Sequence, residues 1–165
     1  MQESGNAPSH SASLQTVARL TCYAAHELFV TPYVDTVFYD GHCGLCHGAV
    51  KFVLRHDREG AFQFAPLQGI TFRESVSASR QAGMPDSILV LTTSGDLLLR
   101  SDAFIYILHR LGGVWQIPAA LVTIVPRPLR DAVYNLIARV RYRIFGHRKN
   151  ICPIVPQELR GRFLD

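Results

Sequence analysis

The sequence lacks an uninterrupted apolar run long enough to cross a membrane. Its longest uncharged apolar stretch, residues 111–125, is broken by Gly112, Gly113 and Pro118, whereas a spanning helix needs roughly 20 apolar residues. The first dozen residues are small and polar and lack the basic and apolar regions of a secretory signal. We therefore expect no spanning membrane segment, and we expect the protein to be cytoplasmic.

Cysteine is also scarce, with four in 165 residues. Disulfide frameworks belong mainly to small secreted domains, so four cysteines in an apparently cytosolic chain indicate thiols with chemistry. With 48% hydrophobic and 18% charged residues, the chain has enough material for one globular domain and not comfortably for two.

Acidic residues are nearly missing from residues 127–149, where seven basic side chains face only Asp131. Such a surface suits an anionic membrane or a nucleic acid, but charge runs are weak evidence and no nucleic-acid motif accompanies this one. We expect a structural helix with a solvated basic face and no nucleic-acid partner. Its apolar residues recur at helical spacing, and we expect them to point inward: Leu129, Val133, Leu136, Val140 and Ile144.

The most informative feature is a C-x-x-C pair, Cys43 and Cys46, that follows an apolar strand and opens a helix. Residues 34–39 are β-branched and aromatic, which predicts a strand, and Asp40-Gly41 ends it. Apolar residues then recur at helical spacing from Cys46 onward. Both thiols are therefore expected at a helix N-terminus, where unpaired backbone N–H groups and the helix dipole stabilise a thiolate.

The two thiols are expected to differ in acidity and exposure. We predict that Cys43, at an exposed tip, is the attacking thiolate, with a pKa of roughly 6–7.5. Cys46 lies one turn inside on the apolar stripe, so we predict it to be the more buried, resolving thiol. The expected donors to the thiolate are the backbone N–H groups of Leu45 and Cys46 and the Cys46 thiol.

The rest of the chain predicts a short strand, a loose helical segment, a hairpin over residues 88–99 and a further helix with Ser101 as its N-cap. We predict that this helix buries Phe104, Ile107, Leu108 and Leu111. The fold class is therefore α/β: a thioredoxin-like mixed sheet flanked by helices, with an N-terminal helical extension and a C-terminal helical addition. Residues 1–33 form a tail with a helix over residues 13–28, and residues 34–165 form the thioredoxin-like domain.

Several separated motifs resemble the DCC family of thioredoxin-like thiol-disulfide oxidoreductases, which is named for an aspartate and two cysteines. The matching segments are Phe38-Tyr39-Asp40-Gly41-x-Cys43-x-x-Cys46, Arg100-Ser101-Asp102-Ala103, Arg141-Tyr142-Arg143-Ile144-Phe145-Gly146 and a later Cys152, within residues 34–164. The resemblance implies a thioredoxin-like fold, dithiol chemistry at Cys43 and Cys46, and Asp40 as the third signature residue. It leaves the substrate open.

One departure concerns substrate docking. Better-known thioredoxin-like proteins place a cis-proline directly before the strand that faces the C-x-x-C, whereas Pro85 stands three residues before Ile88. This leaves Asp86 and Ser87 as candidates for the docking edge.

Two interpretations stay open for each remaining candidate. Asp40 is either a proton acceptor for Cys46 or a turn residue that caps backbone N–H groups. His42 either tunes the nucleophile or is simply exposed. Cys152 is a third redox thiol or an inert small hydrophobe, and Arg100 either anchors the hairpin or faces the site.

These observations favour a thiol-disulfide oxidoreductase of the protein-disulfide reductase type, which acts on a protein or small-molecule disulfide and needs no cofactor. Two alternatives stay open. One is a zinc or iron–sulfur module with His42, His47 and Cys152 as further ligands, although a tetrahedral site needs four ligands and only one C-x-x-C is present. The other is a membrane- or partner-docking module with non-catalytic cysteines.

Overall fold

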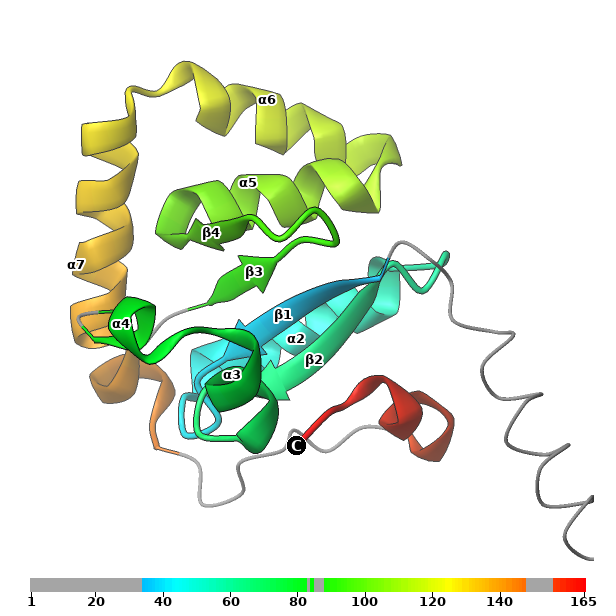
Figure 1. Cartoon of the computed structure of the whole chain (residues 1–165). Helices are drawn as coiled ribbons and strands as arrows, with labels where there is room; N and C mark the ends of the chain where they lie inside the picture. The colour runs from blue at the N-terminus through cyan, green and yellow to red at the C-terminus, as the bar shows by residue number, and fades with distance from the viewer. Residues whose placement is uncertain (1–33, 83, 85–87, 148–155) are drawn as a thin grey trace, which may run out of the picture. The chain divides into compact units, whose positions relative to one another are not determined.

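The structure, a computed structural model, describes residues 34–82, 84, 88–147 and 156–165 (Figure 1). The helix predicted over residues 13–28, the candidate docking edge at residues 85–87 and Cys152 lie outside these ranges. Within them, no helix is long and apolar enough to cross a membrane.

A four-stranded mixed sheet forms the centre of the domain (Figure 1). Its strands are β1 (Asp35–Tyr39), β2 (Phe62–Pro66), β3 (Leu89–Leu91) and β4 (Leu97–Leu99), in the order β2-β1-β3-β4. β2 is parallel to β1, whereas β3 is antiparallel to both β1 and β4. β1 is an inner strand and is buried throughout, so the residues that follow it emerge from the middle of the sheet.

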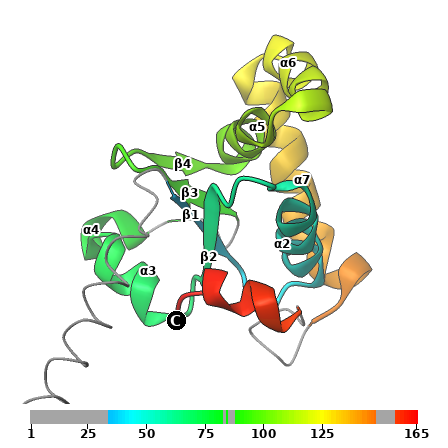
Figure 2. The same ribbon diagram turned by 90° about the vertical axis from the view of Figure 1, so that its right-hand side faces the viewer.

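The helical segments are α2 (Gly44–His56), α3 (Ile70–Ser75), α4 (Ala78–Gln81), α5 (Arg100–Leu111), η1 (Gly113–Trp115), α6 (Gln116–Ile124), α7 (Arg127–Phe145) and η2 (Gln157–Arg162). They cover both faces of the sheet, with α2 and α7 on one side and α3 and α4 on the other (Figure 2). The parallel strands β1 and β2 are joined through α2, as parallel pairing requires. This is the thioredoxin-like α/β fold that the sequence predicts, and α6 and α7 are the predicted C-terminal addition.

Alternation along β1 builds two apolar cores. Val37 and Tyr39 belong to a cluster that contains Val50 of α2, whereas Phe38 belongs to a second cluster with Phe72 of α3. The rings of Phe38 and Phe72 lie 5.0 Å apart, edge to face. Because successive side chains of a strand point to opposite faces, β1 is fixed by both helix layers.

Two predictions for α5 are wrong. β4 runs directly into α5, whose first residue, Arg100, has a left-handed backbone with φ 52°. Ser101 therefore lies inside the helix instead of capping it, and its hydroxyl donates a hydrogen bond to Asp131 of α7. Phe104 is 47% exposed instead of buried, because it faces a cavity between α2, α5 and α7 and not the sheet.

The predicted direction of the apolar stripe on α7 is also wrong. The buried residue of this helix is Arg141, which meets Asp40. Helical periodicity predicts that a stripe exists but not which way it points. The stripe residues that the structure exposes are Leu129, Val133, Leu136 and Ile144.

Candidate redox site

Asp40, Cys43 and Cys46 come together where β1 ends and α2 begins. β1 stops at Tyr39, Cys43 is the N-cap residue of α2, and Cys46 lies in the first turn of the helix. The Cys43 carbonyl accepts a helical hydrogen bond from the His47 N–H at 3.1 Å. Backbone N–H groups of the first turn lack helical partners, so they are available to the Cys43 sulfur.

The surroundings of Cys43 favour its thiolate. Hydrogen bonding from the Cys46 thiol is the largest influence, and it lowers the pKa of Cys43 to about 6 although burial opposes ionisation. The backbone N–H groups of Cys46 and Leu45 and the positive charge of Arg141 act in the same direction. Apart from Arg141, these are the donors that the sequence predicts.

Cys46 has the opposite character. Its hydrogen bond to Cys43, its burial and the negative charge of the Cys43 thiolate raise the pKa of Cys46 well above that of an ordinary cysteine. The two sulfurs therefore share one proton, and Cys46 holds it. Because the thiols are coupled, they titrate as a pair.

Cys43 does not lie at an exposed tip, so the prediction of its exposure is wrong, whereas Cys46 is buried in α2 as predicted. The exposed fraction is 0% for Cys43 and 4% for Cys46. The segment after α7 covers Cys43: the Gly44 N–H donates to the Gly146 carbonyl at 3.3 Å, and Cys43 forms an isolated antiparallel bridge with His147. This cover consists of backbone contacts from a distant part of the chain, which leave no pattern in the sequence.

Asp40 is buried, and both of its carboxylate oxygens are engaged. Oδ1 accepts the His42 N–H at 3.0 Å and the Gln68 amide at 3.3 Å. Oδ2 accepts Nη2 of Arg141 at 3.2 Å and the hydroxyl of Tyr142. Burial alone would raise the pKa of Asp40, but the hydrogen bonds from Tyr142, His42 and Arg141 outweigh it and hold the pKa below its usual value. The carboxylate thus caps a backbone N–H group, and its low pKa makes it a weak proton acceptor.

Arg141 and Tyr142 complete the cluster, and the sequence analysis did not assign them to the site. The Arg141 side chain is only 8% exposed, and its guanidinium lies 4.5 Å from the centre of the Tyr142 ring. Nη1 of Arg141 also donates to the Ala138 carbonyl at 3.0 Å. The signal available in the sequence was the DCC-like motif that contains both residues, but a basic residue in a basic helix is ordinarily expected at the surface.

Of the three other candidates, His42, Arg100 and Cys152, the structure describes the first two. His42 is half-buried next to Cys43, and its ring lies 6.0 Å from that of His147. Arg100 lines an open cavity of about 500 Å³ together with Arg141 and Tyr142, and its role stays a prediction. Cys152 lies outside the described residues.

The sequence model of the DCC1-like thiol-disulfide oxidoreductase family matches residues 37–147, a span that contains Asp40, both thiols and Arg141. The chain belongs to this family. Membership supports a redox role for the site, because the family is described by that chemistry.

Two relatives of this DCC-family chain are similar over most of its length. The uncharacterized protein YuxK of Bacillus subtilis (strain 168) is 36% identical over 132 residues, which cover 78% of this chain and 92% of the relative. The DCC family protein At1g52590 of Arabidopsis thaliana is 30% identical over 118 residues, which cover 72% of this chain and 68% of the relative. No solved structure matches significantly. The plant protein is named as chloroplastic, and the cytoplasmic location of this chain stays a prediction.

Among the described residues, His42 and His47 do not form a metal site with the two thiols. His47 is buried in α2, where its Nε2 lies 2.8 Å from the Gly41 carbonyl. Across residues 34–147 and 156–165, apart from the undescribed loop before β3, no group of three or more His, Cys, Asp or Glu side chains is arranged to hold a metal ion.

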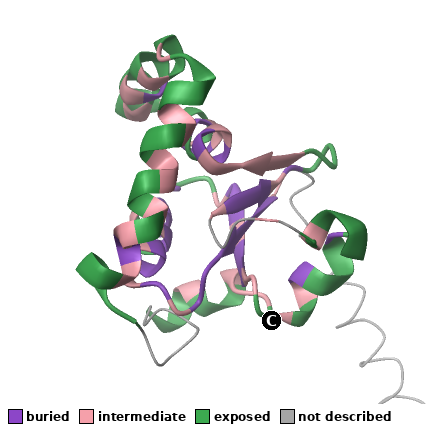
Figure 3. Cartoon of the chain, turned by 90° about the vertical axis from the view of Figure 1, so that its left-hand side faces the viewer, coloured by how far each residue is buried: buried purple, intermediate pink, exposed green. Residues whose placement is uncertain are grey.

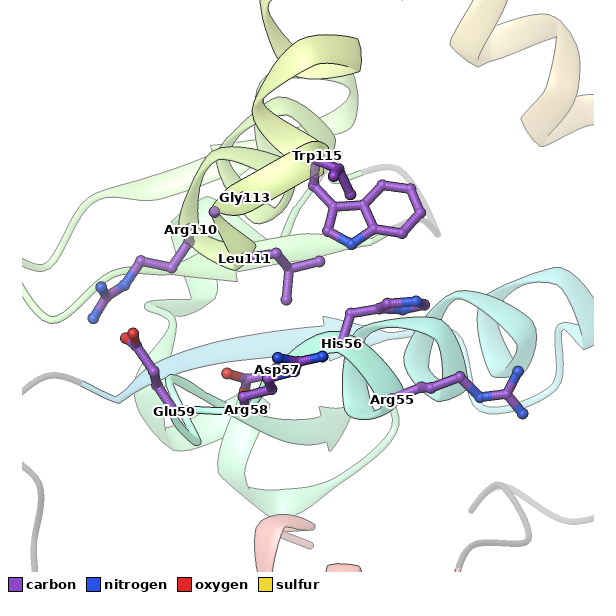
Figure 4. Close-up of a pocket in the computed structure, with 11 residues that line it drawn as sticks. Arg55, His56, Asp57, Arg58, Glu59, Arg110, Leu111, Gly113 and Trp115 are labelled. Carbon is purple, nitrogen blue, oxygen red and sulfur yellow. The ribbon is translucent and has the colours of Figure 1, made fainter.

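Two cavities lie toward opposite ends of α2. One of about 260 Å³ has an almost wholly apolar lining near the start of the helix, with Leu45, Cys46 and Phe104 in its wall. The other, of about 450 Å³, lies at the C-terminal ends of α2 and α5 among charged side chains, with His56 and Trp115 in its wall (Figure 4). The 13 residues of α2 place this second cavity about 20 Å from the thiols, so it is not part of the redox site.

Proposed function

We propose that this DCC-family protein is a thiol-disulfide oxidoreductase of the protein-disulfide reductase type, in which Cys43 attacks and Cys46 resolves. One observation carries the proposal: Cys43 is the N-cap residue of α2 and Cys46 lies in its first turn, and in this arrangement the pKa of Cys43 is lowered to about 6 whereas that of Cys46 is raised. At neutral pH Cys43 is then a thiolate, which is the form that attacks a disulfide, and Cys46 keeps its proton.

The proposed reaction consists of two displacements at sulfur. The Cys43 thiolate attacks one sulfur of the substrate disulfide, so a Cys43–substrate bond forms as the substrate S–S bond breaks and the first thiolate leaves. Cys46 then attacks the Cys43 sulfur, the second substrate thiolate leaves, and the proton of Cys46 passes to a departing thiolate. The substrate gains two electrons, the protein loses two as the Cys43–Cys46 disulfide closes, and a thiol reductant restores the dithiol.

Asp40 and Arg141 are assigned positioning roles in this proposal. Asp40 is ionised and already accepts four hydrogen bonds, which argues against its acting as the base for Cys46. Its negative charge raises the pKa of Cys46, whereas the positive charge of Arg141 lowers that of Cys43. The ion pair therefore adds to the difference in acidity that the hydrogen bond between the two thiols produces.

Attack by Cys43 requires its cover to move. Cys43 forms a backbone bridge with His147, and the Gly44 N–H donates to the Gly146 carbonyl at 3.3 Å. A typical hydrogen bond contributes about 0.5–1.5 kcal/mol, so displacing Gly146 and His147 while Arg141 and Tyr142 stay bound to Asp40 costs much less than the unfolding of the domain. Substrate binding is proposed to accompany this displacement.

Trapping of the mixed disulfide tests the two roles. Cys46→Ser should hold a substrate on Cys43, because the resolving attack is lost, and Cys43→Ser should hold little. Both variants are made in a background with Cys22→Ser and Cys152→Ser, and trapped adducts are identified by mass spectrometry without reductant. Trapping by Cys43→Ser and not by Cys46→Ser would reverse the assignment.

The pH dependence of alkylation tests whether the Cys46 side chain lowers the pKa of Cys43. Iodoacetamide should modify Cys43 fastest above the pKa of about 6, and the rate should fall as the pH drops through that value, since protonation removes the thiolate. Cys46→Ser keeps a hydroxyl donor, whereas Cys46→Ala removes the donor, so the midpoint should move to higher pH in the alanine variant and much less in the serine variant. Equal midpoints would mean that the Cys46 side chain does not control the acidity.

Metal analysis separates this proposal from the metal-binding alternative. We expect the reduced protein to be purified without stoichiometric zinc or iron. Metal bound at one equivalent, and lost when both Cys43 and Cys46 are replaced by serine, would favour a zinc or iron–sulfur module instead.

A further inference from the structure

One face of α7 exposes apolar side chains to solvent. Leu136 is 61% exposed and Ile144 is 66% exposed. Figure 3 views the domain from the side of α7, which is drawn green and pink along most of its length (Figure 3). We call this face the outer stripe, and it consists of Leu129, Val133, Leu136, the half-buried Val140, and Ile144. The spacing of three or four residues makes the stripe continuous along the helix, and a continuous exposed apolar surface marks an interaction site.

The inner face of α7 carries polar contacts that hold the helix to the rest of the domain. Arg141 pairs with the buried Asp40, and Asp131 accepts a hydrogen bond from Ser101 of α5. Turning the helix over would bury the outer stripe only by breaking these contacts. The contacts of the inner face therefore keep the outer stripe out of the domain core. Its exposed apolar side chains indicate a surface that binds a partner.

The charges beside the outer stripe have one sign. Arg139 and Arg143 are exposed and lie one turn apart along the same edge of the stripe. Between residues 112 and 147 the single acidic residue is Asp131, which is held by Ser101 and lies 3.9 Å from Arg127. The preceding helix, α6, carries no charged residue. Its exposed apolar side chains are Ile117, Leu121 and Ile124.

We propose that the outer stripe lies on the surface of an anionic lipid bilayer. A helix with one apolar face and flanking arginines lies in the plane of the interface, with its apolar side chains at the acyl boundary and its cationic groups among the headgroups. The 19 residues of α7 extend over about 28 Å, so one flat surface contacts the whole stripe. The negative surface potential of the bilayer complements the arginines.

A second copy of this chain complements the outer stripe less well. Dimers of identical chains pair the same patch of both subunits. Such pairing would bring Arg139 and Arg143 of two copies into one interface, and in the part of α6 and α7 that forms it no acidic side chain is exposed to pair with them. Like charges across an interface oppose association.

Flotation of the full chain with lipid vesicles tests the proposal. We expect binding to vesicles of phosphatidylglycerol mixed with phosphatidylcholine, and at most weak binding to phosphatidylcholine alone. Binding should decrease as the salt concentration rises from about 0.1 M to about 1 M, because the screening length falls from about 10 Å to about 3 Å.

An apolar variant and its control test the stripe itself. The double variant Val133→Gln and Leu136→Gln should weaken binding to anionic vesicles at least tenfold, since it removes two large apolar side chains from the contact. Ile70→Gln changes an apolar residue that is 61% exposed on α3, and it should bind as the unmodified chain does.

A basic variant and its control test the charge. Arg139→Gln with Arg143→Gln should weaken binding to anionic vesicles by roughly tenfold or more and should remove most of the salt dependence. Arg55→Gln with Arg58→Gln removes two exposed arginines near the end of α2 and should change binding little.

Any of three results would overturn the proposal. The first is failure of the unmodified chain to bind anionic vesicles, and the second is equal binding by the stripe variants and their controls. The third is a dimer, seen by light scattering, that dissociates in the double variant Val133→Gln and Leu136→Gln, which would assign the outer stripe to a second copy. The experiment gives the same answer with Cys43→Ser, so it does not depend on the proposed thiol chemistry.

Discussion

α2 and α7 meet at the thiols, but they are attached to the domain by opposite kinds of contact. α2 turns Val50 and Val53 toward the sheet, where both are buried. α7 turns Arg141 and Tyr142 inward to Asp40 and leaves its apolar residues in solvent. Burial of apolar groups is non-directional and carries no charge, whereas ion pairs and hydrogen bonds depend on geometry and on ionisation. The redox site is therefore assembled from one helix held by packing and one helix held by polar contacts, of which the ion pair with Asp40 lies at the site.

The largest effect should follow from removing the cation that Asp40 faces. Arg141→Met keeps much of the side-chain volume but leaves a buried carboxylate without its partner, so we expect the free energy of unfolding to fall by about 3–5 kcal/mol. Urea unfolding of the reduced protein measures this change. Arg139→Met, at an exposed position on the same helix, is the matched control and should stay within about 0.5 kcal/mol of the unmodified chain.

The same variant should also make Cys43 less acidic, since the charge of Arg141 lowers the pKa of Cys43. Its alkylation profile should move to higher pH, and Arg141→Lys should restore part of the shift. Equal stability of Arg141→Met and Arg139→Met would show that the ion pair does not hold α7, and the contrast between the two helices would then fail.

A smaller effect on stability is expected from a matched pair of valines, one buried on α2 and one exposed on α7. Val50 of α2 is 1% exposed and Val133 of α7 is 52% exposed. Val50→Ala should cost about 2–3 kcal/mol in the free energy of unfolding, from lost burial and the cavity left behind. Val133→Ala should change it by no more than about 0.5 kcal/mol. Comparable losses in urea unfolding would mean that the outer face of α7 is covered within the chain.

The smallest predicted effect concerns the contact between α5 and α7. Ser101→Ala removes the hydroxyl that donates to Asp131, while Arg127 stays 3.9 Å from that carboxylate. We expect a loss of about 1 kcal/mol, measured by urea unfolding. Ser75→Ala, at an exposed position on α3, is the control. An equal loss of stability in both variants would mean that the hydrogen bond from Ser101 to Asp131 does not help to hold α7.

The junction of β1 and α2 could be predicted because its signals are local. A β-branched strand, an Asp40-Gly41 break and helical spacing after Cys46 all lie within a few turns of chain. The direction of α7 could not be predicted in this way. It depends on Asp40, which is remote in sequence and meets Arg141 only in the folded domain.

The burial of Cys43 was missed for a related reason. Position at a helix N-terminus predicts which groups can stabilise a thiolate, and it does so correctly for Leu45 and Cys46. It contains no information on what packs over the sulfur. The cover comes from Gly146 and His147 through backbone contacts. Every residue except proline carries the same backbone donor and acceptor, so the side-chain pattern does not predict these contacts.

The bridge between Cys43 and His147 links two equilibria in the protein. Closing the proposed Cys43–Cys46 disulfide removes the Cys43 thiolate charge, which acts on Arg141 in addition to Asp40, so the reduced and oxidised forms would hold the end of α7 with different free energies. Coupling between equilibria is reciprocal, and a ligand of α7 that prefers one form shifts the midpoint potential of the dithiol by the same free energy. A tenfold preference corresponds to about 30 mV for a two-electron couple. In the proposed reaction, a ligand bound to the outer stripe of α7 would thus adjust the midpoint potential of the thiols.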